Sequence, residues 1–236
     1  MKIDILGVKI DNLTMEGTLE RIRDFLTDGR QHYIVLPYSE FVVRAQKDEK
    51  FRKILNEADL CLCEGRGLYF ALRFLGKKLM QEINGIELIY KLSQKSKVKS
   101  QKLFLLGGTE DVVRKTAEKL GDNIIGFEHG YQNLDKVIDK INLARPDILL
   151  VGLGSPRQEK WIYDNLKKMP SVKVAIGVGG AFDFISARIK RAPKFIQKIG
   201  LEWLWRLILQ PWRIKRIYNG VIKFSWLILK CKLRKN

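Results

Sequence analysis

The sequence predicts an α/β fold in which a mostly parallel, Rossmann-like sheet carries helices on both faces. Short apolar runs typical of buried strands alternate with amphipathic, helix-like segments over residues 1–193. Several of the runs end in glycine-rich turns, as strands do where they lead into helices. After residue 193 the strand signal disappears. We therefore predict an α/β catalytic core over residues 1–193 and a helical C-terminal appendage, here called the tail, over residues 194–236.

The predicted elements follow one another in a regular order. The strand-like runs are residues 3–10, 33–37, 59–63, 102–106, 123–127, 147–151 and 172–176. The helix-like segments of the core include residues 14–27, 39–46, 48–56, 84–92 and 134–143. Three more are expected: one that follows Gly67, one that ends at Leu120 and one that ends at Lys167. In the tail we expect helices over residues 199–210, 212–219 and 221–232, separated by Pro211 and Gly220.

Charge divides the chain in the same way. The 236 residues carry a formal net charge of +18, and residues 187–236 hold 14 basic side chains against a single acid, Glu202. A charge of this size concerns partners rather than fold. We expect no secretory leader, because a strand-like run follows Met1 directly, and no membrane-spanning segment, because no apolar run approaches the necessary length. Three scattered cysteines suit a reducing compartment rather than a disulfide framework.

The tail reads as a basic amphipathic surface. Four of the five tryptophans lie in it, and an apolar stripe recurs at helical spacing at Leu201, Leu204, Trp205, Ile208 and Trp212. Basic residues with flanking tryptophans are typical of helices that lie in a membrane interface. We therefore expect Trp203, Trp212 and Trp226 to touch an anionic bilayer. The alternative is a helix packed on the core, with its charges in water.

Glycine-rich turns predict a binding site. Gly107 with Gly108, Gly152 with Gly154, and residues 177–180 each follow a predicted strand, where ligands of parallel sheets bind. Glycine allows backbone amides to approach a phosphate closely, although such turns also need glycine for steric reasons alone. Gln158 and Glu159 begin the next helix, where they either bind sugar hydroxyls or mark an exposed helix start.

Several reaction classes find little support. No Asp-x-Asp pair is present to hold a divalent metal against a diphosphate. The charge of a bound diphosphate would therefore have to be neutralised by arginines, lysines and backbone amides. A hydrolytic triad is improbable, because the sequence has two histidines and no nucleophile-elbow motif. The charge would suit nucleic acid, but the core is only mildly basic and carries no recognised nucleic-acid motif, so we expect none to bind.

Longer motifs carry a family resemblance. They read VGLGSPRQEKW at residues 151–161, GVGGAFD at 177–183, KRAP at 190–193, GLEWLWR at 200–206 and PWR at 211–213, with ILGV near the start. Together they closely resemble the WecG/TagA/CpsF glycosyltransferases, family 26. The resemblance covers essentially the whole chain.

That resemblance implies a GT-E-like fold and an inverting, metal-independent transfer from a UDP-sugar to a polyprenyl-diphosphate-linked sugar. Such reactions build teichoic acid, capsule or exopolysaccharide at the cytoplasmic face of the bacterial membrane. No cofactor is implied, since the UDP-sugar is a substrate, and family members are also seen as homo-oligomers. The positions that match the nucleotide-sugar pocket and its closing tail are Gln158, Asp183, Lys190, Arg206, Arg213 and Arg216.

The catalytic base implied by the resemblance is Glu64. The family has Pro-Asp-Gly where this chain has Cys63-Glu64-Gly65, and a glutamate can also accept the proton of an attacking hydroxyl. The alternative is an acid that merely favours a helix N-terminus.

Departures from the family lie at the presumed sugar or acceptor end. Leu36-Pro37-Tyr38 replaces Thr-Pro-Asn, and Glu82 lies near the position of a family arginine. We expect Leu36, Tyr38, Glu82 and Asn84 to form the sugar or acceptor pocket. We expect retained nucleotide-sugar binding with a changed sugar or acceptor. The alternatives are a catalytically degenerate homologue and a non-catalytic membrane scaffold.

Overall fold

The computed structural model describes residues 2–94, 101–193, 195–196 and 201–234, with the side chain of Arg213 left out. Its centre is a six-stranded, entirely parallel sheet in the order β4-β3-β8-β7-β5-β6. The strands are β3 (His32–Val35), β4 (Leu60–Cys61), β5 (Leu103–Gly107), β6 (Ile124–Glu128), β7 (Ile148–Gly152) and β8 (Val174–Gly177). The predicted parallel α/β core is confirmed.

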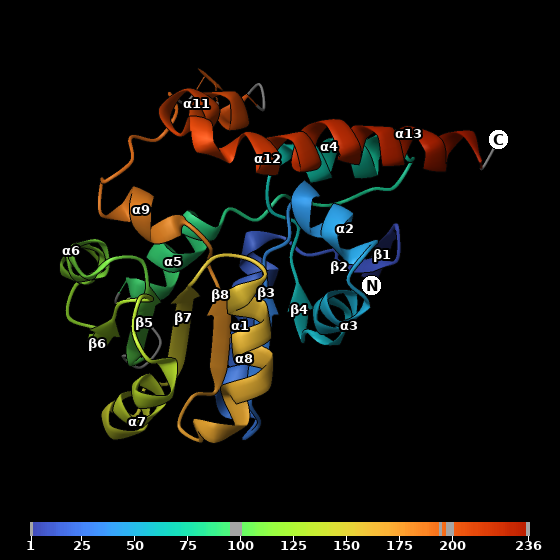
Figure 1. Ribbon diagram of the computed structural model, residues 1–236. Coiled ribbons are helices and arrows are strands. Elements are labelled where there is room, and N and C mark those ends of the chain that lie inside the picture. The colour runs from blue at the N-terminus through green and yellow to red at the C-terminus, as the bar shows by residue number, and fades with distance from the viewer. Residues whose placement is uncertain (1, 95–100, 194, 197–200, 235–236) are drawn as a thin grey trace.

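Helices cover both faces of the sheet, as predicted (Figure 1). One face carries α1 (Met15–Thr27), α5 (Gly85–Ser93), α6 (Glu110–Leu120) and α9 (Ala181–Ile185); the other carries α2 (Ser39–Ala45), α3 (Glu49–Glu57), α4 (Arg66–Phe74), α7 (Leu134–Ala144) and α8 (Arg157–Asn165).

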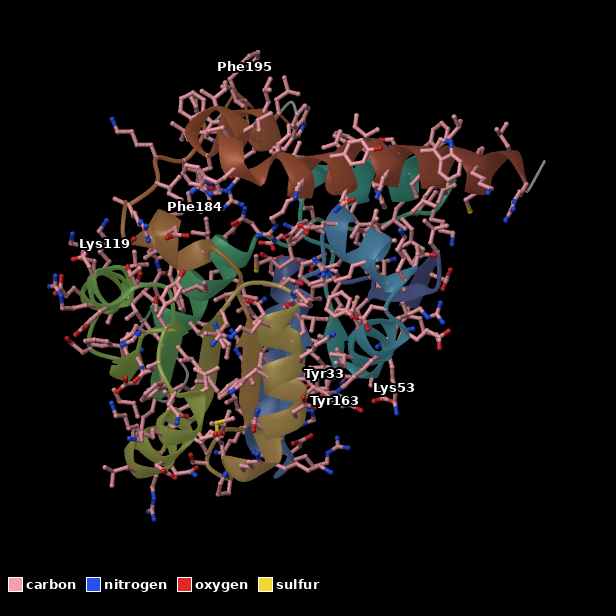
Figure 2. All side chains as sticks on the ribbon, viewed as in Figure 1. Tyr33, Lys53, Lys119, Tyr163, Phe184 and Phe195 are labelled. Atoms are coloured by element: carbon pink, nitrogen blue, oxygen red, sulfur yellow. The ribbon has the colours of Figure 1, made fainter. Side chains whose placement is uncertain are left out.

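Strand side chains alternate between the two layers, so the sheet has a core on each side. Val35 and Leu149 belong to one core, and Ile34 and Leu150 to the other. All strands of the sheet except the edge strand β6 are buried on both faces, which explains their nearly continuous apolar sequence. On one side an edge-to-face contact between Tyr33 of β3 and Tyr163, with ring centroids 6.0 Å apart, holds α8 against the sheet (Figure 2).

The first predicted strand, residues 3–10, is wrong as a single element. It is a hairpin of β1 (Lys2–Ile5) and β2 (Val8–Asp11), which pair antiparallel outside the main sheet. The turn residues Leu6 and Gly7 both have positive φ, as a tight two-residue hairpin requires. The signal was Gly7 in the middle of the apolar run.

The described part of the tail comprises residues 195–196 and, from residue 201 on, α11 (Glu202–Leu209) and a 3-10 turn (Pro211–Arg213). α12 (Ile214–Ile217), a π-helical turn (Tyr218–Lys223) and α13 (Phe224–Leu233) complete it. The predicted helix break at Gly220 is wrong, because helical structure runs through it. Gly220 packs against Glu40 of α2, where a Cβ would lie 3.7 Å from the Glu40 Cβ. The part of the first tail helix predicted over residues 199–200 lies outside the described residues.

The tail crosses the edge of the sheet at which the strands end (Figure 1). Phe224 and Ile228 of α13 are buried in the same apolar cluster as Phe41 of α2. Arg216 of α12 forms an ion pair with Glu40, Nε to Oε2 at 2.9 Å. These contacts fix the second half of the tail on the core, next to the site described below.

Candidate active site

A cavity of about 1270 Å³ lies between the carboxyl ends of the strands and the tail. The core contributes the loops after β3, β4, β5, β7 and β8, and the tail contributes residues from α11, α12 and α13. This is where ligands bind in parallel sheets. The predicted site residues that line it are Leu36, Tyr38, Glu64, Glu82, Asn84, Gly108, Gly152, Gly154, Gln158, Gly179, Asp183, Arg206 and Arg216. Trp203, for which we predicted contact with the bilayer, lines the cavity as well.

Glu64 enters the cavity from the short loop after β4. Its backbone amide donates to the Pro37 carbonyl at 2.9 Å, and its Oε1 accepts from the Gly85 amide at 3.0 Å. A Cβ at Gly85 would lie only 2.7 Å from that oxygen, so glycine permits this approach. Burial raises the pKa of Glu64 to about 7, against the lowering effects of the Gly85 hydrogen bond and of Arg206. A carboxylate that titrates near neutrality suits a general base.

Arg206 reaches the cavity from the tail. Its guanidinium lies 4.6 Å from the ring centroid of Phe184 and close above Gly180. Figure 2 shows Phe184 on the side of α9 that faces the tail helices. The Nε and Nη2 atoms of Arg206 are buried, and neither has a hydrogen-bond partner among the described residues. Buried donors normally have partners, so this pair is suited to an anionic ligand.

The glycine-rich turns bring strand ends into close contact. Gly107 has a φ of +137°, and a Cβ there would lie 2.3 Å from the carbonyl oxygen of Gly152. Gly107 therefore serves the packing of β5 against β7 and does not line the cavity, whereas Gly108 next to it does. For Gly107 the steric reason for glycine is the one that the structure supports.

Gln158 and Glu159 are both buried, so the alternative of an exposed helix start is wrong. Gln158 accepts from the Gly179 amide at 3.0 Å and donates to Glu159 Oε1 at 2.6 Å. Gln158 lines the cavity, while Glu159 lies behind it. Burial raises the pKa of Glu159 to about 7, against the hydrogen bond from Gln158. This pair joins α8 to the glycine-rich turn after β8.

Arg216 lines the cavity, but its charge already has protein partners. Besides the ion pair with Glu40, it donates to the Tyr38 hydroxyl, which in turn donates to Glu40 at 3.2 Å. Arg44 lies 3.4 Å from the other oxygen of Glu40. Tyr38 therefore contributes to tail docking as well as to the cavity wall.

Glu82 pairs with Arg66 at the start of α4, Oε2 to Nε at 3.1 Å. Burial raises the pKa of Glu82, against the positive charge of Arg66. Asn84 caps α5, where its side chain accepts from the Glu87 amide at 3.1 Å. The charge inversion at Glu82 is thus compensated within the same cavity.

The remaining predicted residues differ in their positions. Asp183, in the first turn of α9, lies 3.7 Å from Arg188 and lines the cavity. Lys190 is exposed and does not line it, although its carbonyl accepts from the Trp205 indole at 3.1 Å. The side chain of Arg213 is outside the described part of the structure.

Sequence reasoning missed Glu40, Phe184 and the pair Phe70 and Phe74, which also line the cavity. Glu40 carried a signal, because it is an acid in an otherwise apolar stretch leading into Phe41. Within the described residues, no three His, Cys, Asp or Glu side chains gather as a metal-binding group. No helix of the described chain is long and apolar enough to cross a bilayer.

Comparison with known proteins decides the family. The model of the glycosyl transferase WecG/TagA/CpsF family matches residues 3–236. The chain belongs to this family. Among curated proteins it is similar to the N-acetylglucosaminyldiphosphoundecaprenol N-acetyl-beta-D-mannosaminyltransferases of Staphylococcus aureus strains NCTC 8325, COL and MRSA252. Each is 34% identical over 239 residues, covering 98% of this chain and 93% of the relative. The predicted glycosyltransferase activity is therefore confirmed.

Proposed function

We propose that this WecG/TagA/CpsF glycosyltransferase transfers a hexose or N-acetylhexosamine from a UDP-sugar to a polyprenyl-diphosphate-linked sugar, with inversion and without a metal. The proposal places it at the cytoplasmic face of the bacterial membrane, in the synthesis of teichoic acid, capsule or exopolysaccharide. The staphylococcal relatives support the acceptor class, since their names specify a sugar-diphosphate-undecaprenol. The observation that carries the proposal is that Glu64 and Arg206 face one cavity, from the core and from the tail.

In the proposed mechanism Glu64 accepts the proton of the acceptor hydroxyl while the oxygen of that hydroxyl attacks the anomeric carbon of the donor sugar. The bond to the UDP oxygen breaks in the same displacement, and the negative charge moves onto the diphosphate. The two partnerless donors of Arg206 and the amides of the glycine-rich turns supply the stabilisation that this leaving group needs. Positioned donors of this kind are commonly worth factors of about 10²–10³ in rate.

Arg216 has a more limited part in this proposal. Its positive charge is already paired with Glu40, and its guanidinium also donates to Tyr38, so less of that charge remains to neutralise a diphosphate. We propose that Arg216 supports the docked tail and that Arg206 is the principal cation for the diphosphate. The proposed nucleotide-sugar contacts of Asp183, Gln158 and Lys190 rest on the family motifs.

Membrane contact is also part of the proposal. Trp212 and Trp226 are 73% and 59% exposed, and α11 has no buried residue, so its apolar stripe is not covered by the core. Figure 2 shows Phe195 at the outer side of the tail, pointing away from the sheet. Exposed apolar side chains with many basic neighbours suit an anionic bilayer surface.

The decisive experiment is transfer from a panel of UDP-sugars to a short-chain polyprenyl-diphosphate sugar, with product identified by mass and UDP binding measured by calorimetry. We expect turnover with at least one donor, and an activity that is unchanged by chelators. UDP binding without turnover for any donor would instead support a degenerate homologue. If the protein neither binds UDP nor turns over any donor, the proposal is refuted.

A further inference from the structure

The cavity extends well beyond the proposed reaction centre, along α4. This helix starts directly after Glu64 and Gly65, and its cavity-lining residues Gly67, Phe70, Ala71 and Phe74 recur at a helical spacing of three and four. Residues on one face of a helix at that spacing form a continuous wall. At 1.5 Å per residue, this wall runs about 10 Å away from Glu64.

The opposite wall of this extension comes from the tail. Phe224, Ser225, Ile228 and Leu229 line the cavity and lie on one face of α13. Lys232, one turn further on, lies 5.9 Å from the ring centroid of Phe74, which brings the end of α13 close to the end of α4. We call the space between these two helices the α4–α13 groove.

The chemistry of the groove differs from that of the rest of the cavity. Around Glu64 and Arg206 the lining includes charged residues of both signs, whereas none of the described lining residues of α4 from Phe70 onward or of α13 is charged. Phe70 and Phe74 are 50% and 53% exposed, although large aromatic side chains gain free energy when they are covered. Among the described residues, a nucleotide or a sugar would find a charged group only at the far end of this groove, at Lys232, while a hydrocarbon chain would find walls that are apolar except for Ser225.

We infer that the α4–α13 groove binds the first isoprenoid units of the polyprenyl-diphosphate acceptor, with its sugar-diphosphate head at Glu64. This inference rests on the proposed function. It explains why an apolar groove is continuous with a charged reaction centre, because a polyprenyl-diphosphate sugar has the same two parts in the same order. The chain would leave the groove near Lys232, on the side of the molecule where the basic residues Lys230 and Lys232 of α13 could face anionic lipid.

Two soluble acceptors with the same sugar-diphosphate head test the groove, one ending in a farnesyl chain and one in a methyl group. The full-length protein is assayed without membranes and below the micelle concentration of the farnesyl compound. We expect the KM for the farnesyl acceptor to be at least tenfold lower than for the methyl acceptor. The double variant Phe70→Ser/Phe74→Ser should raise the farnesyl KM about tenfold, equivalent to about 1.4 kcal/mol, and leave the methyl KM and UDP affinity unchanged.

The matched control is Trp226→Ser, because Trp226 lies on α13 but does not line the cavity. It should change neither KM, and circular dichroism checks that all variants are folded. Equal KM values for the two acceptors of the wild type would overturn the inference while leaving the proposed function intact. The same holds if the double variant raises both KM values equally, or if Trp226→Ser has the same effect as the double variant. Failure to use either acceptor with any donor would refute the proposed function, and the inference with it.

Discussion

Glu64 illustrates how one carboxyl group is prepared for proton transfer. Its carboxylate accepts from the first amide of α5, which favours the charged form, while burial and the acids Glu82 and Glu202 favour the neutral form. The neutral form gains more, and the pKa rises from the ordinary 4.5 to about 7. A proton acceptor with this pKa is deprotonated in about half of the molecules at pH 7 and is more basic than an ordinary carboxylate.

Glu64→Gln should therefore lower kcat by about 10²-fold or more and leave UDP affinity unchanged, because the amide cannot accept the proton. In the wild type kcat/KM should fall as the pH drops below about 7, since Glu64 is then protonated. Steady-state rates over pH 5–9 and calorimetry with UDP measure these effects. An unchanged kcat in the variant would remove Glu64 from the mechanism.

The same substitution should not cost stability. A carboxyl whose pKa is raised by folding destabilises the folded protein progressively as the pH rises from about 4.5 through about 7. Glutamine carries no such charge and keeps an oxygen for the Gly85 amide. Above pH 7 the variant should melt at the same temperature as the wild type or higher, which thermal denaturation checks. A lower melting temperature there would mean that Glu64 is mainly structural.

Gly85→Ala is a subtler test of the position of Glu64. The new Cβ would lie 2.7 Å from Glu64 Oε1, so the carboxylate must move by several tenths of an ångström. We expect kcat to fall about tenfold because proton transfer depends on position. Gly17→Ala in α1 is the matched control, since its Cβ meets nothing closer than 3.6 Å. If both variants are equally active, the closeness of Gly85 to Glu64 has no catalytic role.

At the scale of elements, the joint between α2 and α12 decides how the tail lies over the site. Glu40 is almost fully buried and receives Arg216, Tyr38 and, more distantly, Arg44. Removing one partner of a buried ion pair leaves a charge without compensation, which costs about 3–5 kcal/mol when no other partner remains. Here the remaining contacts of Glu40 should reduce that cost.

Arg216→Met should therefore destabilise the protein by about 2 kcal/mol, which lowers the melting temperature by roughly 4–8 °C for a chain of this size. Glu40→Gln/Arg216→Met should recover part of the loss, because the double variant leaves no buried charge unpaired. Thermal denaturation of the two single variants and the double variant gives the coupling between them. Additive losses would show that the pair does not hold the tail.

The elements also show how far sequence could predict this molecule. The inner strands of the main sheet were predictable because they are buried on both faces, as in Ile148–Gly152, and therefore read as unbroken apolar runs. The hairpin at Leu6 and Gly7 was missed, because one apolar pattern fits a long strand and two short ones, and a single glycine in the run does not decide between them. The helical path through Gly220 was missed because packing on Glu40, a contact distant in sequence, outweighs the low helix propensity of glycine.

The candidate site was predictable to the extent that motifs mark it. Glu64, Gln158 and Arg206 were identified from motif positions, and all three line the cavity. The partners that define their chemistry were not, since Phe184 and Gly85 meet them only through the fold. Likewise, no local pattern indicates that Arg216 would form an ion pair with Glu40, which lies 176 positions away in the sequence.

At the scale of the whole molecule, the tail has two sides with different environments. Its inner side carries Arg206 and the buried Phe224 and Ile228 against the core. Its outer side leaves Ile208, Trp212 and other large apolar residues exposed. Burial of such side chains in a bilayer would bring an acceptor anchored there to the cavity, which is a reason for building the active site partly from the tail.

Trp212→Ser/Trp226→Ser should therefore weaken binding to vesicles that contain anionic lipid by about tenfold or more. The variant removes two largely exposed indole rings that would otherwise be buried in the membrane interface. Leu143→Ser is the matched control, because Leu143 is 87% exposed but lies on α7 of the core. Vesicle flotation at low and high salt measures both the apolar and the electrostatic contribution, and raised salt should weaken wild-type binding. Transfer to a soluble acceptor should be unaffected, because neither tryptophan lines the cavity. If the tryptophan variant and the Leu143 variant bind vesicles as the wild type does, the exposed face of the tail has another partner, and the proposed membrane contact is wrong.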